Sequence, residues 1–236
     1  MPPEKKPSLA FAVEFETVIV PDKPCTSENG WCPGEVSYTS SFYIKQNMKN
    51  IDAIILPGGF SHGDHLRAGA IAQFSPVMKD VTKFNHEGRP IIGICNGFQI
   101  LCESGILPGA LIRNRNLKFN CSFVNLKSNK SQIFTSLVPK NKILKIPISH
   151  GEGNYQADAN TLDTILENNQ IVFQYCTESG LINNESNPNG SINNIAGIVN
   201  KNGNVLGMMP HPERSCSIDL GSEDGNLIFK SMISSI

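Results

Sequence analysis

The sequence predicts an α/β fold: a single three-layer domain with a largely parallel central sheet and antiparallel strands added in the C-terminal half. Two short apolar runs, residues 51–56 and 90–94, end abruptly at Pro57 and at Cys95. Uninterrupted apolar runs of this length are typical of strands buried on both faces of a parallel sheet. Between them, residues 69–86 carry apolar side chains at helical spacing, with Pro76 expected at a helix start or kink. Together the three segments predict a βαβ crossover.

The first fifty residues fit this pattern least well. Residues 9–13 are predicted to form a strand, because Glu14 cuts the apolar run short and no signal-peptide cleavage site follows. Residues 18–20 and 35–40 could form further strands. The prolines and glycines between them leave no room for a helix of ordinary length.

Beyond residue 110, short strands replace the crossover pattern. Residues 200–204, Asn-Lys-Asn-Gly-Asn, are a good hairpin turn. The Asn-rich stretch 183–194 is expected to be a surface loop, and residues 226–236 a closing helix. The strands are predicted at residues 123–126, 143–148, 170–175, 195–199 and 205–209.

The composition is that of a globular protein with no excess of charge. The 236 residues are 39% hydrophobic and 17% charged, and 20 Lys+Arg against 21 Asp+Glu give a net charge of −1. This balance argues against nucleic-acid binding, which needs clustered cations. No apolar run has the length of a membrane span. We therefore expect a cytoplasmic protein with neither nucleic acid nor membrane as a partner.

The seven cysteines predict neither a disulfide framework nor a zinc site. Their number is odd and no two form a Cys-x-x-Cys pair, so most are expected to be small buried hydrophobes. His62 and His65 have a spacing that suits a metal, but their loop supplies no obvious third and fourth ligand. No metal is therefore expected.

Cys95 alone among the cysteines has a sequence context that suggests chemistry. The segment Gly-Ile-Cys-Asn-Gly, residues 93–97, has the form of a nucleophile elbow with Cys as the nucleophile. Such a turn is strained, and the flanking glycines remove side chains that would clash. A helix start also favours negative charge at that point. The same pattern fits a buried structural cysteine before a helix, because short motifs recur by chance.

Two other segments carry the groups that a thiol nucleophile needs. In Met-Pro-His-Pro-Glu-Arg, residues 209–214, an extended backbone would place His211 and Glu213 on the same side. A histidine can accept the thiol proton, and a carboxylate can orient the imidazole. Gly58 and Gly59 follow a predicted strand and let backbone N–H groups approach a ligand, as an oxyanion hole requires. The N–H of Asn96 could be the second donor. Either segment could also be a plain turn.

Two further features would adjoin the same site. Gln99 lies one helical turn beyond Cys95 on the same face, although such residues are more often solvated. Residues 150–154, His-Gly-Glu-Gly-Asn, follow the strand predicted to end at Ile148. They could form a plain loop or one that contacts a ligand.

In this order, these motifs resemble the class I glutamine amidotransferases, and among them the amidotransferase subunits of phosphoribosylformylglycinamidine synthase. Residues 1–50 depart from that family, whose first strand leads through a short loop into an amphipathic helix. We expect one amidotransferase domain over residues 1–236 with this divergent start. The resemblance covers roughly residues 51–236 and rests on PGGFSHGDHLRAGAIA, GICNGFQIL, LPGALIRN with NLKF, HGEGN and GNVLGMMPHPER.

The resemblance implies a role for each matching residue. Cys95 would attack the side-chain amide of glutamine, form a γ-glutamyl thioester and release ammonia. His211 would be the base and acid, with Glu213 orienting it, while Gly59 and Asn96 would supply the oxyanion N–H groups. The residues that would hold glutamine are Gly58, Gln99, His150, Gly151 and Glu152.

The resemblance also implies partners. The family passes ammonia to a larger synthetase subunit, which uses ATP and magnesium to make formylglycinamidine ribonucleotide from formylglycinamide ribonucleotide in purine biosynthesis. A small accessory subunit usually joins the complex. No cofactor is expected in this chain, which has no phosphate-cradling loop.

Two other functions stay open. The chain could be a non-catalytic relative that acts as a regulatory or binding subunit, or a stand-alone γ-glutamyl or peptidase-like hydrolase of the same fold. The presence of Cys95, His211 and Glu213 disfavours the first, and the sequences around NGFQIL and HPER disfavour the second.

Overall fold

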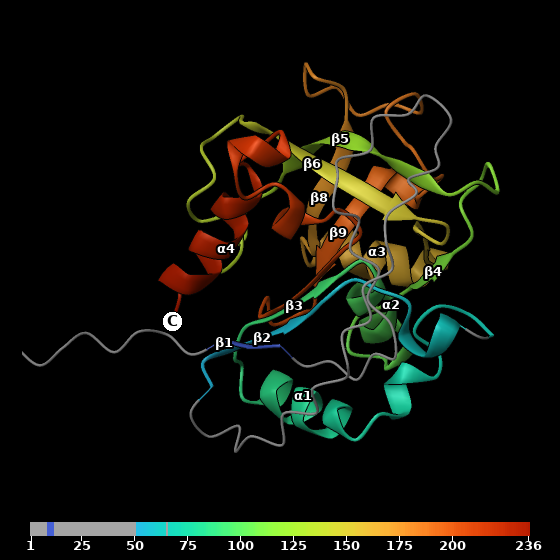
Figure 1. The fold of residues 1–236 in the computed structure, drawn as a ribbon, viewed down its shortest axis with the longest axis vertical. Helices are drawn as coiled ribbons and strands as arrows, with labels where there is room; N and C mark the ends of the chain where they lie inside the picture. Colours follow the sequence, from blue (N-terminus) through green and yellow to red (C-terminus); the bar gives the residue numbers. More distant parts are fainter. Residues whose placement is uncertain (1–8, 12–50, 65) are drawn as a thin grey trace, which may run out of the picture.

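One eight-stranded sheet runs through the protein, of which the computed structural model describes residues 9–11, 51–64 and 66–236 (Figure 1). The order across the sheet is β1-β2-β3-β10-β9-β8-β5-β6. The strands suggested at residues 18–20 and 35–40 lie outside the described residues, as does His65. The strands of the sheet are β1 (Leu9–Phe11), β2 (Ala53–Leu56), β3 (Ile91–Ile94), β5 (Asn120–Ser128), β6 (Ile143–His150), β8 (Ile171–Cys176), β9 (Ile195–Val199) and β10 (Val205–Met208).

The sheet has a parallel and an antiparallel part, as the sequence predicts. β1, β2, β3 and β10 pair in parallel, and β9, β8, β5 and β6 continue the sheet with antiparallel pairings. Every residue of β2 and β3 is buried, which explains their unbroken apolar sequences. β1 confirms the first three residues of the strand predicted at residues 9–13. Because parallel strands end at the same edge, the segments after β2, β3 and β10 meet there.

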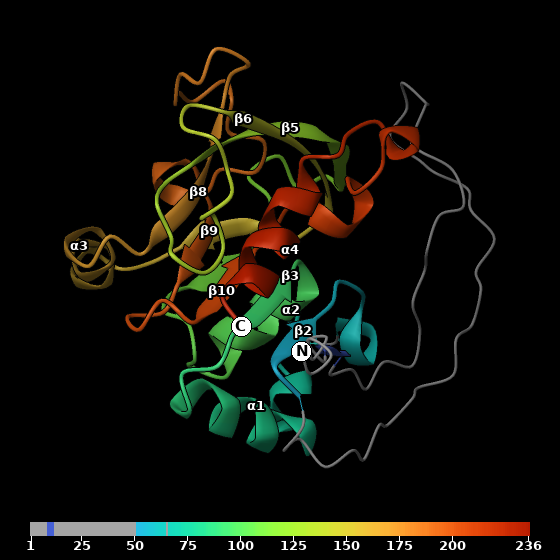
Figure 2. The ribbon, with the colours of Figure 1, turned by 90° about the vertical axis from the view of Figure 1, so that its left-hand side faces the viewer.

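The helices cover both sides of the parallel strands. α1 (Val77–His86) and α4 (Gly225–Ser234) lie on opposite sides of β2 and β3 (Figures 1 and 2), which gives the predicted three layers. α2 (Asn96–Glu103) packs against β3 and β10. The helix predicted over residues 69–86 starts later, because Pro76 occupies the position before α1. Phe74, expected on its buried face, lies in a short 3-10 turn and is exposed.

Three elements are absent from the sequence prediction. α3 (Ala159–Glu167) buries only Ile165 fully and therefore lacks a clear apolar stripe. The other two, β4 (Ala110–Ile112) and β7 (Asn154–Gln156), form a small antiparallel pair. β6 also continues to His150, two residues beyond the predicted end, because its pairing with β5 extends to Asn120. His150 is thus a strand residue and not part of the turn.

Three properties of the described part bear on function. Its cysteines form no disulfide with one another. None of its helices has the length and apolar character that crossing a membrane requires. Within the same residues, no three His, Cys, Asp or Glu side chains gather closely enough to hold a metal ion.

Candidate active site

Cys95 lies at a strained turn between β3 and α2. Its φ of 51° and ψ of −105° place a non-glycine residue in an unfavourable region, at a cost of about 1–3 kcal/mol. Backbone hydrogen bonds hold the turn: the N–H of Cys95 donates to the carbonyl of Met208 at 2.8 Å, and the N–H of Gln99 donates to the carbonyl of Cys95 at 3.1 Å. This geometry is that of the predicted nucleophile elbow.

The glycines beside Cys95 allow a close approach of backbone segments. A Cβ atom on Gly97 would overlap the carbonyl oxygen of Leu56 at the end of β2. One on Gly93 would lie 2.7 Å from the carbonyl oxygen of Gly97. Neither position can accept a side chain without moving β2 or α2, which confirms why the elbow needs glycine on both sides.

His211 and Glu213 form the contact that the sequence predicts, but not through an extended backbone. Residues Pro212–Arg214 form a 3-10 turn, and His211 precedes it. The Nδ1 atom of His211 lies 2.6 Å from Oε1 of Glu213. Since a carboxylate only accepts, Nδ1 carries the proton. His211 is 2% exposed, whereas the Glu213 side chain is 42% exposed.

Cys95 and His211 lie against the same glycine. A Cβ atom on Gly58 would lie 2.7 Å from Cε1 of His211 and 3.4 Å from Cβ of Cys95. Nε2 of His211 is buried and has no hydrogen-bond partner among the described residues. The Sγ atom of Cys95 lies 3.7 Å from the carbonyl oxygen of Ser149. The imidazole nitrogen that would exchange a proton with the thiol is therefore not engaged by another group of the described residues.

The charges around His211 favour its protonated form. Burial lowers the pKa of His211, but the negative charges of Glu213 and Cys95 together outweigh burial and raise the pKa to about 9. For Glu213, burial raises the pKa, but the charge of His211, the hydrogen bond to it, a backbone hydrogen bond and the charge of Arg214 together lower the pKa below its usual value. An imidazolium beside a cysteine is the arrangement that supports a thiolate nucleophile.

The side chain of Asn96 ties α2 to the loop after β2. Its Oδ1 accepts two hydrogen bonds from Ser61, one from the backbone N–H at 3.2 Å and one from the hydroxyl. Its Nδ2 donates to Oδ1 of Asp64 at 3.1 Å. Asn96 begins α2, so its own N–H has no acceptor within the helix. Gly59 lies two residues before Ser61, and the network thus fixes the loop and the helix start that carry both proposed oxyanion donors. Sequence reasoning missed Ser61 and Asp64, although both lie in the motif SHGD.

Gln99 lies at the site, and both ends of its side-chain amide form hydrogen bonds within the protein. It is 5% exposed, its Oε1 accepts from Asn96 at 2.9 Å, and its Nε2 donates to the carbonyl of Glu152 at 2.7 Å. The carboxylate of Glu152 accepts the N–H of Ala68 at 3.2 Å. These bonds join α2, the loop after β2 and the turn after β6.

His150 is a second buried histidine at this site. It is 3% exposed, and burial together with the charge of His211 lowers its pKa to about 3, so it is neutral. Its Nδ1 lies 3.1 Å from Oδ1 of Asn114, a fully buried residue that sequence reasoning did not select. Asn114 also accepts the N–H of Gly153 at 3.0 Å and donates its own N–H to the carbonyl of Gly151 at 2.9 Å. The motif LPGALIRN, which ends at Asn114, was the available signal.

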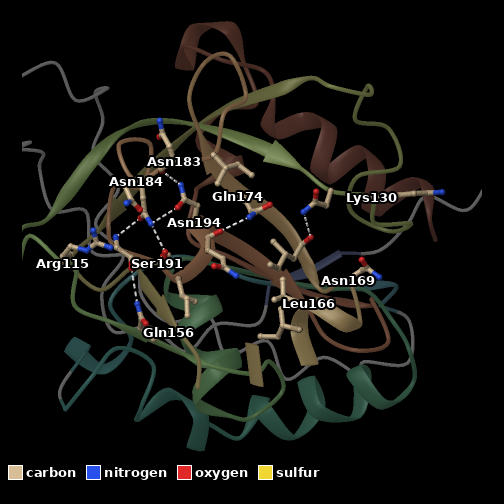
Figure 3. Close-up of a pocket in the computed structure, with 18 residues that line it drawn as sticks. Arg115, Lys130, Gln156, Leu166, Asn169, Gln174, Asn183, Asn184, Ser191 and Asn194 are labelled. Carbon is tan, nitrogen blue, oxygen red and sulfur yellow. Dashed lines mark hydrogen bonds between the residues drawn. The ribbon is translucent and has the colours of Figure 1, made fainter. Parts of the chain in front are cut away.

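A large hollow elsewhere on the protein contains none of the predicted site residues (Figure 3). It measures about 1160 Å³ and lies along β8, between α3 and the Asn-rich stretch 183–194. Arg115 and Lys130 are the charged side chains in its lining. Several of its amides are already bonded to the protein, as the dashed lines show; Gln174, for example, donates to the carbonyl of Asn193 at 2.9 Å. The chemistry-bearing groups gather at Cys95, not here.

Comparisons with known proteins agree with this geometry. A model of the CobB/CobQ-like glutamine amidotransferase domain matches residues 25–221. Phosphoribosylformylglycinamidine synthase subunit PurQ of Koribacter versatilis is 49% identical over 225 residues, which are 94% of this chain and 97% of the relative. The subunit of the same name from Chlorobium chlorochromatii is 48% identical over 95% of this chain and 98% of its own length. In the structure of PurLQS from Thermotoga maritima, one chain is 34% identical and has a TM-score of 0.76 over 98% of this chain and 99% of that one.

Proposed function

This chain belongs to the glutamine amidotransferase family, and from this we propose that it is the glutaminase subunit of a phosphoribosylformylglycinamidine synthase. It hydrolyses glutamine to glutamate and ammonia and delivers the ammonia to a larger synthetase subunit. The observation that carries the proposal is the elbow at Cys95 with the His211–Glu213 pair beside it. This pair supplies the proton transfers that an amide hydrolysis needs.

The reaction runs in two steps through Cys95. First, Sγ attacks the side-chain amide carbon of glutamine, and the N–H groups of Gly59 and Asn96 stabilise the oxyanion. His211 carries the thiol proton to the leaving nitrogen, so the C–N bond breaks, ammonia leaves and a γ-glutamyl thioester remains. In the second step, water gives a proton to His211 and attacks the thioester, which releases glutamate and restores the thiol.

The residues proposed to hold glutamine come from segments around Cys95, and hydrogen bonds join some of these segments. Gln99 and Glu152 are joined at 2.7 Å, and Glu152 in turn receives the N–H of Ala68. These contacts support a pocket formed by α2, the loop after β2 and the turn after β6. The proposed binding residues are Gly58, Gln99, His150, Gly151 and Glu152.

The ammonia is used by partners. The relatives are named as a synthase subunit, and the Thermotoga maritima structure is named as a PurLQS complex, which supports a larger synthetase subunit and a small accessory subunit as partners. We place ATP and magnesium at the synthetase subunit and no cofactor in this chain. The cytoplasmic location stays a prediction from the sequence.

The decisive variant is Cys95→Ser, tested in the complex with its synthetase. A hydroxyl stays protonated at neutral pH and is a far weaker nucleophile than a thiol, so glutamine-dependent product formation should fall by about a thousandfold or more. Ammonia supplied from solution bypasses the thioester and should still be used at the wild-type rate. Product formation from the two nitrogen sources is compared in parallel.

Cys176→Ser is the matched control, because Cys176 is a buried cysteine of β8 and lies outside the elbow segment 93–97. It should retain turnover of glutamine. Glutamine-dependent turnover by Cys95→Ser, or an equal loss with both nitrogen sources, would show that Cys95 is not a dedicated amide nucleophile.

A further inference from the structure

The orientation of the buried Asn114 side chain is fixed by its partners. Its Nδ2 donates to two carbonyl oxygens, those of Lys118 at 2.8 Å and His150 at 2.9 Å. Its Oδ1 accepts the N–H of Gly153 at 3.0 Å. A carbonyl oxygen only accepts and an N–H only donates, so exchanging the oxygen and nitrogen of this amide would break all three hydrogen bonds.

This orientation determines which nitrogen of His150 carries the proton. The atom of Asn114 that lies 3.1 Å from Nδ1 of His150 is the acceptor Oδ1. Nδ1 must therefore donate, and in a neutral imidazole the other nitrogen, Nε2, then has a lone pair. The Nε2 atom is buried and has no hydrogen-bond partner among the described residues. A buried acceptor without a partner is costly and requires an explanation.

His150 cannot turn away from this arrangement. A Cβ atom on Gly153 would lie 2.6 Å from Nε2 of His150 and would overlap other atoms of the ring, so Gly153 packs directly on the imidazole. The preceding residue, Ser149, presents its carbonyl oxygen to the thiol of Cys95. The other titratable groups at the site are Cys95, His211, Glu213, Glu152 and Asp64, and of these the charge of His211 acts on His150. The ring is thus fixed beside the reacting groups.

We propose that Asn114 is a positioning residue that holds His150 as the neutral Nδ1–H tautomer, so that Nε2 accepts an N–H of bound glutamine. The inference rests on the proposed glutaminase function. Glutamine offers two kinds of N–H group, the side-chain carboxamide and the α-ammonium, and both need an acceptor. An imidazolium could not serve, because both of its nitrogens donate. An amide partner at Nδ1 fixes the tautomer without adding the negative charge that would favour the imidazolium.

The tautomer can be measured without any enzymatic activity. In the full chain with ¹⁵N-labelled histidine, NMR should show His150 protonated at Nδ1 and unprotonated at Nε2 from pH 8 down to the lowest pH at which the protein is folded. A spectrum with Nε2 protonated, or with an imidazolium at neutral pH, would overturn the inference. If the complex has no glutamine-dependent activity at all, the proposed function is wrong, and this spectrum still decides the tautomer.

Replacing the amide by a carboxylate tests the consequence for binding. In Asn114→Asp the negative charge should raise the pKa of His150, and below that pKa Nε2 would donate instead of accept. The KM for glutamine should then rise about tenfold as the pH falls through the new pKa, while kcat changes less. The wild type should show no such step. Asn116→Asp is the control, because Asn116 is exposed in the same segment and its side chain forms hydrogen bonds to its neighbours Lys118 and Asn120.

The source of the N–H is distinguished with 4-carbamoylbutanoate, which has the carboxamide of glutamine but no α-ammonium. If the KM of Asn114→Asp rises at low pH for both substrates, the contact is with the carboxamide. If it rises for glutamine alone, the contact is with the α-ammonium. Either result supports the acceptor role. If Asn114→Asp is folded and the pKa of His150 has risen, but the KM rises at low pH for neither substrate, the acceptor role is wrong.

A second pair of variants covers the case in which Asn114→Asp does not fold, since its new oxygen faces the carbonyls of Lys118 and His150. His150→Leu removes the acceptor and should raise the KM for glutamine about tenfold. His150→Gln supplies a neutral amide oxygen and should recover most of that loss. Equal KM values for the Leu and Gln variants would show that Nε2 accepts nothing from the substrate.

Discussion

The two buried histidines of the site differ in the group that faces Nδ1. His211, after β10, is 2% exposed and contacts the carboxylate of Glu213, while His150, at the end of β6, is 3% exposed and contacts the amide of Asn114. Burial lowers the pKa of both. The charges of Glu213 and Cys95 nevertheless raise that of His211 to about 9, whereas the charge of His211 further lowers that of His150 to about 3. Since burial is nearly equal, the neighbouring charges decide which imidazole is protonated.

This difference separates two tasks at one site. The protonated His211 can give and take protons during thioester formation and hydrolysis. The neutral His150 is fixed in one tautomer, in which Nδ1 donates a hydrogen bond and Nε2 can accept one. This suits substrate binding. A carboxylate at one Nδ1 and an amide at the other therefore let two imidazoles work side by side without both becoming charged.

The largest effect should come from removing the histidine that transfers protons. His211→Ala leaves the thiol without a base and the ammonia without an acid, so glutamine-dependent kcat/KM should fall about 10²- to 10⁴-fold. Ammonia-dependent synthesis in the complex should be unchanged. His86→Ala is the control, because His86 is exposed at the end of α1. A comparable loss with ammonia would mean that His211 supports the complex and not the amide hydrolysis.

A smaller effect is expected when only the charge at Nδ1 is removed. In Glu213→Gln the pKa of His211 should fall from about 9, because burial remains and the carboxylate no longer opposes it. For each unit by which the pKa drops below the assay pH, the imidazolium fraction decreases about tenfold. NMR titration of His211 gives the new pKa, and kcat/KM for glutamine should decline less than in His211→Ala.

Glu223→Gln provides the comparison for this variant, because Glu223 is exposed and lies before α4. It should leave the titration of His211 as in the wild type. An unchanged pKa in Glu213→Gln would show that the contact of 2.6 Å does not set the charge of His211.

The sequence predicted the half of the site that depends on local backbone geometry. The elbow at Cys95 follows from an apolar strand, two glycines and a helix start, all within one short segment. The pairing of His211 with Glu213 was also predicted, because the residues are two positions apart. Its backbone was not: the segment forms a 3-10 turn instead of an extended strand, and Pro212 at the first position of that turn fits it.

The other half depends on contacts between distant segments. Asn114 is 36 residues from His150 in the sequence, and Ser61 is 35 residues from Asn96. Neither pair has a spacing that a periodicity or capping rule could detect. For Gln99, the sequence predicted the position beside Cys95 but not that both ends of its amide would form hydrogen bonds within the protein.

The smallest expected effect concerns a carboxyl group that, like His150, has an amide partner. Burial raises the pKa of Asp64 to about 6, helped by the charge of Glu152, and the hydrogen bond from Asn96 offsets this only in part. Between its usual value of 3.8 and about 6, the folded protein therefore holds a proton that the unfolded chain has lost. Stability must then fall as the pH rises through that window and stay level above it.

Asp64→Asn should remove this pH dependence. An asparagine can still accept the hydrogen bond from Asn96, and it tolerates the φ of 48° at this position. Because Asp64 is only half-buried, solvent screening limits the gain to about 1 kcal/mol, or a rise in Tm of about 2–4 °C relative to the wild type. The difference should be absent at pH 4, develop up to pH 6 and then remain constant. Asp163→Asn, on the exposed side of α3, should show no such trend. A Tm difference for Asp64→Asn that is the same at pH 4 and pH 7 would mean that the carboxyl is already charged throughout, and that an amide partner suffices to stabilise a buried charge here.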